Sequence, residues 1–83
     1  MKTTQFHSTK NLLTSREQEI IRLITQEYST KEIAQQLYLS FETVKSHRHS
    51  IMTKLNVKNV AGIVREAFYI GIVSLSDHLM IAS

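Results

Sequence analysis

Apolar residues recur every three or four positions in four stretches of the chain, and this spacing predicts four α-helices. We expect them over residues 15–26, from 29 for about two turns, over 41–55 and over 60–70. The absence of proline and the presence of only 2 glycines also favour long helices, so the predicted fold class is all-α. The apolar stripes are Ile20, Ile21, Leu23 and Ile24; Ile33, Ala34 and Leu37; Val44, Ile51 and Leu55; and Val60, Ile63, Val64 and Ala67.

Capping residues mark where these helices begin and end. Thr14 with Glu17, and Ser29 with Glu32, match the capping box, in which each side chain bonds to the backbone of the other residue. The remaining predicted caps are Ser40 and Asn59 before the third and fourth helices, and Asn56 and Gly71 after them.

The fourth predicted helix has apolar residues on more faces than a single packed surface requires. Besides its core stripe it carries Ala61 and Phe68 on another side. We therefore expect one stripe to pack on the core and the other to pack on a second copy of the chain.

The polar segment 1–11 is predicted to be a flexible N-terminal arm or linker, 12–75 to be the folded domain, and 76–83 to be a C-terminal tail. No apolar run approaches the roughly 20 residues that cross a bilayer, and the N-terminus does not resemble a signal peptide. The absence of cysteine excludes disulfides and cysteine catalysis and fits a reducing compartment. A cytoplasmic protein is the expectation.

Positive charge is concentrated in one part of the sequence. Residues 43–65 contain 5 basic groups and no carboxylate, which gives +5, whereas residues 1–42 contain 5 of each and sum to zero. Residues 66–83 contain only Glu66 and Asp77, so the net charge of +3 originates in the middle segment. This pattern suits a polyanionic partner.

Residues 29–48 match a helix-turn-helix, a unit that places its second helix in the major groove of DNA. In that second helix Lys45, Ser46, His49 and Thr53 are predicted to point outward. Because the acid-free segment begins inside the same helix, we favour DNA contact over a merely solvated basic face.

Four motifs resemble the LuxR-type DNA-binding domain, and most closely the NarL/FixJ output domains of bacterial response regulators. They are L-T-x-R-E-x-E at 13–19, K-E-I-A-x-x-L at 31–37, S-x-x-T-V-K-x-H-R at 40–48 and I-M-x-K-L at 51–55. The resemblance covers about residues 12–75. This chain departs from it at Glu27 and Asn56, where the family commonly has glycine, and Glu27 would be strained in a left-handed conformation.

The resemblance implies that residues 41–55 form a recognition helix in the major groove of double-stranded DNA. Lys45, Ser46 and His49 are the implied base contacts, and His47 is expected to pack and to hydrogen-bond locally. Arg48 has two open alternatives, a phosphate contact or an ion pair with an acid of the first or second helix. The implied phosphate contacts are Lys31, Ser40, Thr43, Arg48, Lys54 and Lys58.

The leading hypothesis is a sequence-specific transcription regulator, or a response-regulator output domain, that acts as a homodimer through the fourth helix. Its predicted interface consists of Ala61, Val64, Arg65 and Phe68. The alternative is a protein-interaction module that uses the same fold to bind another regulator or RNA polymerase.

Enzymatic and ligand-binding functions find little support in the residues. His47 and His49 are two positions apart on a helix and point in different directions, so a metal site is not expected. There is no glycine-rich phosphate loop, and the carboxylates lie mostly at helix N-termini, where capping explains them. We expect no catalytic residue, no cofactor and no small-molecule ligand.

Overall fold

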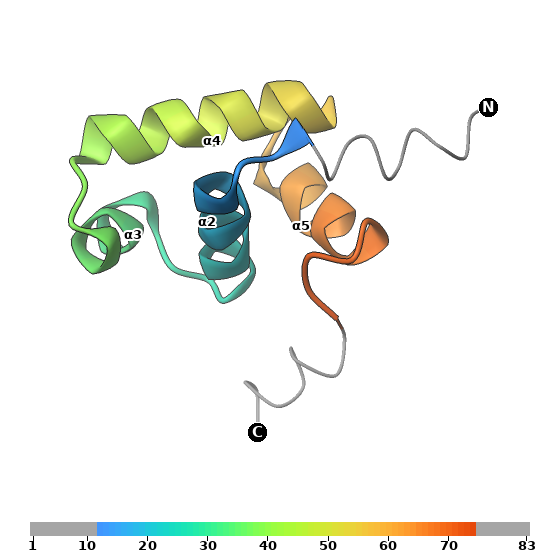
Figure 1. Ribbon diagram of the computed structural model, residues 1–83, viewed down its shortest axis with the longest axis horizontal. Helices are drawn as coiled ribbons and strands as arrows, with labels where there is room; N and C mark the ends of the chain where they lie inside the picture. Colours follow the sequence, from blue (N-terminus) through green and yellow to red (C-terminus); the bar gives the residue numbers. More distant parts are fainter. Residues whose placement is uncertain (1–11, 75–83) are drawn as a thin grey trace.

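The computed structural model describes residues 12–74, and these form four helices and no strand. They are α2 (Ser15–Thr25), α3 (Thr30–Leu37), α4 (Phe41–Leu55) and α5 (Val60–Tyr69), labelled as in Figure 1. The predicted all-α class is confirmed. Each helix begins within one residue of its predicted start, α2, α4 and α5 also end within one residue of their predicted ends, and α3 has the predicted length of about two turns. The predicted arm 1–11 and tail 76–83 lie outside the described residues, so the domain boundaries stay a prediction.

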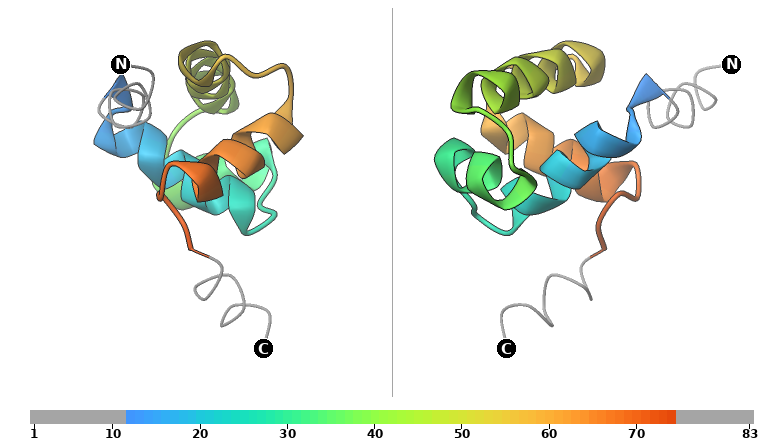
Figure 2. Two further views of the ribbon diagram at one scale, coloured as in Figure 1. Left: turned by 90° about the vertical axis from the view of Figure 1, so that its right-hand side faces the viewer. Right: turned by 60° about the vertical axis from the view of Figure 1, so that its left-hand side comes forward.

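Helix α4 lies across one side of the molecule, and the three other described helices lie beneath it (Figure 1). α2 packs against both α4 and α5, and α3 packs against α4. The turned views in Figure 2 show the same arrangement, with the outer side of α4 covered by none of the described helices. The longest helix is therefore held along one flank and open along the other.

Isoleucines from all four helices form the centre of the core. Ile20 and Ile21 of α2, Ile33 of α3, Ile51 of α4 and Ile63 of α5 are fully buried. The predicted core stripes are thus confirmed at their centres. The stripes are less buried at their edges: Leu23, Leu37 and Val64 are half-buried, and Val60 is 41 % exposed at the start of α5.

The predicted caps are confirmed. The Thr14 hydroxyl accepts from the Glu17 amide at 3.0 Å while the Thr14 amide donates to Glu17 Oε1 at 2.9 Å, and Ser29 with Glu32 repeats this pattern at 3.1 and 2.8 Å. The remaining caps lie where predicted: Ser40 and Asn59 at N-termini, with left-handed Asn56 (φ 56°) and Gly71 (φ 86°) following α4 and α5.

The turn from α2 to α3 uses a left-handed residue that is not glycine. Glu27 has φ 70°, so the strain anticipated at this position is present. Its amide donates to the Ile24 carbonyl at 2.9 Å, and the next amide, of Tyr28, donates to the Leu23 carbonyl at 3.2 Å. These two bonds are those of a Schellman closure, which normally contains glycine at this position. The turn is kept at a conformational cost.

Glu27→Gly should therefore stabilise the domain by about 0.5–1 kcal/mol, because relief of left-handed strain exceeds the entropy that glycine adds to the unfolded chain. Thermal or denaturant unfolding measures the change. Gln26→Gly is the matched control, since Gln26 has φ −91° and gains no relief, so that variant should lose stability. Equal effects of the two substitutions would contradict the strain.

Candidate nucleic-acid interface

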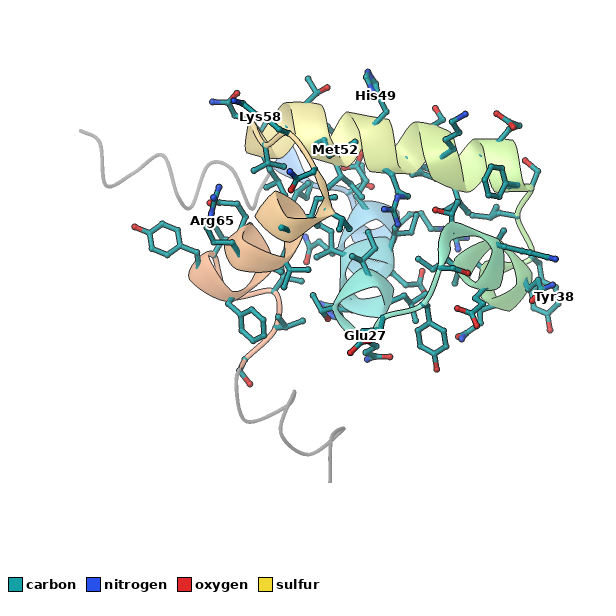
Figure 3. All side chains as sticks on the ribbon, turned by 180° about the vertical axis from the view of Figure 1, so that it is seen from behind. Glu27, Tyr38, His49, Met52, Lys58 and Arg65 are labelled. Carbon is teal, nitrogen blue, oxygen red and sulfur yellow. The ribbon has the colours of Figure 1, made fainter. Side chains whose placement is uncertain are left out.

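The outward face of α4 gathers the predicted base-contacting residues. Lys45, Ser46, His49 and Thr53 are all exposed. Residues four apart lie on one helix face, which groups positions 45, 49 and 53, and Figure 3 shows His49 projecting away from the bundle. The predicted outward orientation is confirmed, whereas base contact itself stays a prediction.

The N-terminus of α4 presents a second set of donors. Ser40 Oγ accepts from the Thr43 amide at 3.0 Å and donates to Thr43 Oγ1 at 2.8 Å, so the Thr43 hydroxyl keeps its own proton for an outside acceptor. Both residues are exposed, as is Lys31 in the first turn of α3. The partial positive charge of a helix N-terminus favours a phosphate at such a position.

Lys54 forms an ion pair with a buried carboxylate. Its Nζ lies 2.8 Å from Oε1 of Glu17, and Ser50 Oγ donates to Oε2 of the same carboxylate at 3.0 Å. Glu17 is only 4 % exposed, while the Lys54 side chain is 30 % exposed. The carboxylate that sequence reasoning recognised as a helix cap is also the anchor of α4, and the positive charge of Lys54 is largely neutralised there.

The ionisation of Glu17 reflects two opposing effects. Burial raises its pKa, but the hydrogen bonds from Lys54, from the Thr14 amide and from Ser50 outweigh this effect and lower the pKa below its ordinary value. Glu17 is therefore a carboxylate at neutral pH. It joins the first turn of α2 to the C-terminal half of α4 through a charge-assisted network.

Arg48 belongs to none of the ion pairs found in the described residues. It is half-buried and lines a depression of about 370 Å³ between α2, α3 and α5, with Glu27 among the other lining residues. No carboxylate of residues 12–74 lies within ion-pair distance of its guanidinium. The ion pair predicted for Arg48 is thus not found in this part of the chain, and its phosphate contact stays a prediction.

His47 is half-buried, as the sequence predicts for a packing residue. Its ring forms none of the side-chain hydrogen bonds found in the described part of the chain, so the local bond predicted for it is not observed there.

The predicted interface on α5 is partly open. Ala61 and Arg65 are exposed, and Val64 and Phe68 are half-buried. Ile63 and Ala67 of the same helix are fully buried, so the helix turns one stripe inward and leaves another accessible. Lys58 lies exposed in the turn that precedes α5.

Residues 12–74 contain no group of three or more histidine, cysteine or acidic side chains that could hold a metal ion. None of the helices described here is long and apolar enough to cross a membrane.

A four-helix domain whose helix-turn-helix exposes a basic outer face defines a DNA-binding module. Comparison with known families agrees, because the family described as "Bacterial regulatory proteins, luxR family" matches residues 11–67. The chain belongs to this family. It is a DNA-binding transcription regulator rather than an enzyme.

Three relatives are similar to this chain over very different shares of their own length. The spore germination protein GerE of Bacillus subtilis is 44 % identical over 71 residues, which are 86 % of this chain and 95 % of GerE. The uncharacterized response regulatory protein YgeK of Escherichia coli is 41 % identical over 69 residues, 83 % of this chain and 47 % of YgeK. The oxygen regulatory protein NreC of Staphylococcus epidermidis is 45 % identical over 56 residues, 68 % of this chain and 26 % of NreC.

Glu17→Gln should destabilise the domain by about 1–2 kcal/mol, because the amide keeps the cap but loses the charge-assisted bonds. A lowered pKa means that the stabilisation is complete above the ordinary carboxyl pKa and is lost as the pH falls through the folded-state value. The unfolding free energy of the wild type should therefore fall with acid more steeply than that of the variant.

Urea unfolding across the acid range tests both statements. Glu32→Gln is the matched control, since Glu32 holds the same capping-box position on α3 but forms no ion pair in the described structure. Glu32→Gln should lower the free energy of unfolding by less than Glu17→Gln does. Parallel acid profiles of wild type and Glu17→Gln would show that the network does not stabilise the fold.

Proposed function

We propose that the chain binds a specific double-stranded DNA sequence as a homodimer, with α4 in the major groove. The observation that carries this proposal is the open flank of α4, whose outer face exposes Lys45, Ser46 and His49 while its inner stripe is buried. The family supports DNA binding in general. The exposed face supports this helix as the reading element.

The side chains on this face differ in what they can recognise. Lys45 can donate to O6 and N7 of guanine, a contact that discriminates against other bases by roughly 1–3 kcal/mol when well aligned. His49, one turn further along, can donate to a base acceptor or a phosphate, and Ser46 is small and specifies weakly. Lys31, Ser40, Thr43 and Lys58 are the proposed phosphate contacts, which orient the helix without reading sequence.

Lys54 contributes less to this interface than its charge suggests. A phosphate would compete with Glu17 for the same ammonium group, and breaking that pair would leave a buried carboxylate unpaired. We therefore assign Lys54 mainly to holding α4 in place.

Helix α5 is the proposed contact between two copies of the chain. The accessible side chains of Ala61, Val64 and Phe68 form an apolar stripe beside the buried one. A two-fold contact through this stripe would present two recognition helices to half-sites about 34 Å apart, one turn of DNA. Contact with RNA polymerase is the second candidate function, and the exposed aromatic side chains of Tyr38 (96 %) and Phe41 (49 %) are the accessible groups that favour it.

Lys45→Ala should lower affinity for the preferred duplex by about tenfold or more while barely changing affinity for a mixed-sequence duplex, because only base contacts discriminate. The preferred duplex is obtained by selection from a random pool, which also reveals half-site symmetry. Lys58→Ala is the comparison: as a phosphate contact it should weaken both duplexes equally. If no sequence were enriched from the random pool and Lys45→Ala changed the affinity for neither duplex, only the protein-interaction alternative would be left.

Phe68→Glu should reduce the number of chains bound per preferred duplex from two to one, because it places a carboxylate in the apolar contact. Sedimentation of the protein–DNA complex measures this number. Leu12→Glu introduces the same charge at an exposed apolar residue outside α5 and should leave two chains bound. One chain per duplex for the wild type would exclude the α5 dimer.

A further inference from the structure

Two shallow depressions meet at the turn between α4 and α5. One, of about 430 Å³, extends from the turn to His49 on α4, and the other, of about 470 Å³, extends to Arg65 on α5. Asn56, Val57 and Lys58 line both, so the two hollows form one continuous surface. No carboxylate lines either depression.

Two cations, Lys58 and Arg65, and the imidazole of His49 follow this surface from one helix to the other. Figure 3 shows His49, Lys58 and Arg65 on the same side of the molecule, although they come from α4, the turn and α5. We call this surface the His49–Lys58–Arg65 strip. It continues the face of α4 that is proposed to read bases.

The turn holds the strip in a fixed shape. A Cβ atom built on Gly62 would lie 2.6 Å from Cβ of Val57, so only glycine lets the turn approach α5 this closely. The Val57 amide also donates to the Met52 carbonyl at 3.0 Å. Lys58 is thereby kept beside the first turns of α5, near Arg65.

Arg65 is oriented by its neighbour. Its Nε donates to Glu66 Oε2 at 3.2 Å, and its side chain is 68 % exposed while that of Glu66 is 19 % exposed. A guanidinium has five N–H donors in a planar fork. One edge is therefore fixed by the less exposed carboxylate, and the N–H groups of the outer edge can donate to an outside anion.

We propose that the strip binds the sugar–phosphate backbone of DNA beyond the bases that α4 reads, and that Arg65 is a phosphate contact. This inference rests on the proposed function. Cations, amide side chains and no lining carboxylate suit a phosphodiester chain, and arginine matches phosphate geometry well. A dimer role fits Arg65 less well, because a two-fold contact repeats the residue on both copies and brings like charges to one apolar face.

Arg65→Gln tests the proposal, with affinity measured for the preferred and the mixed-sequence duplex over a range of salt concentrations. Loss of one phosphate contact should weaken both duplexes by a similar factor, roughly five- to tenfold near 0.1 M salt, and reduce the log–log salt slope by about 0.9. Arg22→Gln is the matched control, since Arg22 is exposed on α2 and lines neither depression. Thermal melting verifies that both variants are folded.

Position on the DNA is tested with neutral methylphosphonates at single phosphates flanking the selected bases. At the phosphate that Arg65 contacts, the methylphosphonate should lower the affinity of the wild type. It should not lower the affinity of Arg65→Gln, because that variant already lacks the contact. Arg65→Lys should retain part of the salt slope. An unchanged slope in Arg65→Gln, or an altered number of chains per duplex as its only effect, would overturn the assignment. Lys45→Ala in the same assay separates the two proposals: if it weakens the preferred duplex while Arg65→Gln is inert, only the strip fails.

Discussion

The carboxylate of Glu17 is the interaction on which the position of the reading helix depends. It accepts from the Thr14 amide at the start of α2 and from Ser50 and Lys54 on α4. A carboxylate this deeply buried is tolerated only with partners that satisfy it, so the network fixes which side of α4 turns inward. Ser50 and Lys54 are half-buried beside the buried stripe of Val44, Ile51 and Leu55, and positions 45, 49 and 53 lie on the exposed side of the helix.

The same network changes the meaning of the basic segment. Of its five cations, Lys54 is paired with the buried Glu17, and Arg48 is half-buried and lines the depression beside α3 and α5. Lys45, Lys58 and Arg65 are the exposed remainder. The charge of this segment is therefore not all equally available. Lys54 mainly holds α4 in place, whereas the exposed cations are accessible to a polyanion and would contribute to a salt-dependent affinity.

Sequence patterns predict the helices here because helix signals are local. A cap such as Thr14 or Ser29 needs only a residue three positions away, and apolar spacing needs only one helix. The left-handed Tyr38 at the end of α3 escaped prediction, because no glycine or asparagine marks it. The pairing of Lys54 with Glu17 escaped prediction as well, since these residues are 37 positions apart and only the packed fold brings them together.

Gly62 joins the two halves of the proposed interface. A glycine inside a helix ordinarily lowers stability by roughly 1 kcal/mol relative to alanine, yet here it admits the side chain of Val57 against α5. This contact ties the C-terminal end of α4 to the N-terminal half of α5, so the reading helix and the proposed dimer helix are held as one unit. If two copies join through α5, the distance between their recognition helices then follows from that rigid connection, and with it the half-site spacing that the dimer can bind.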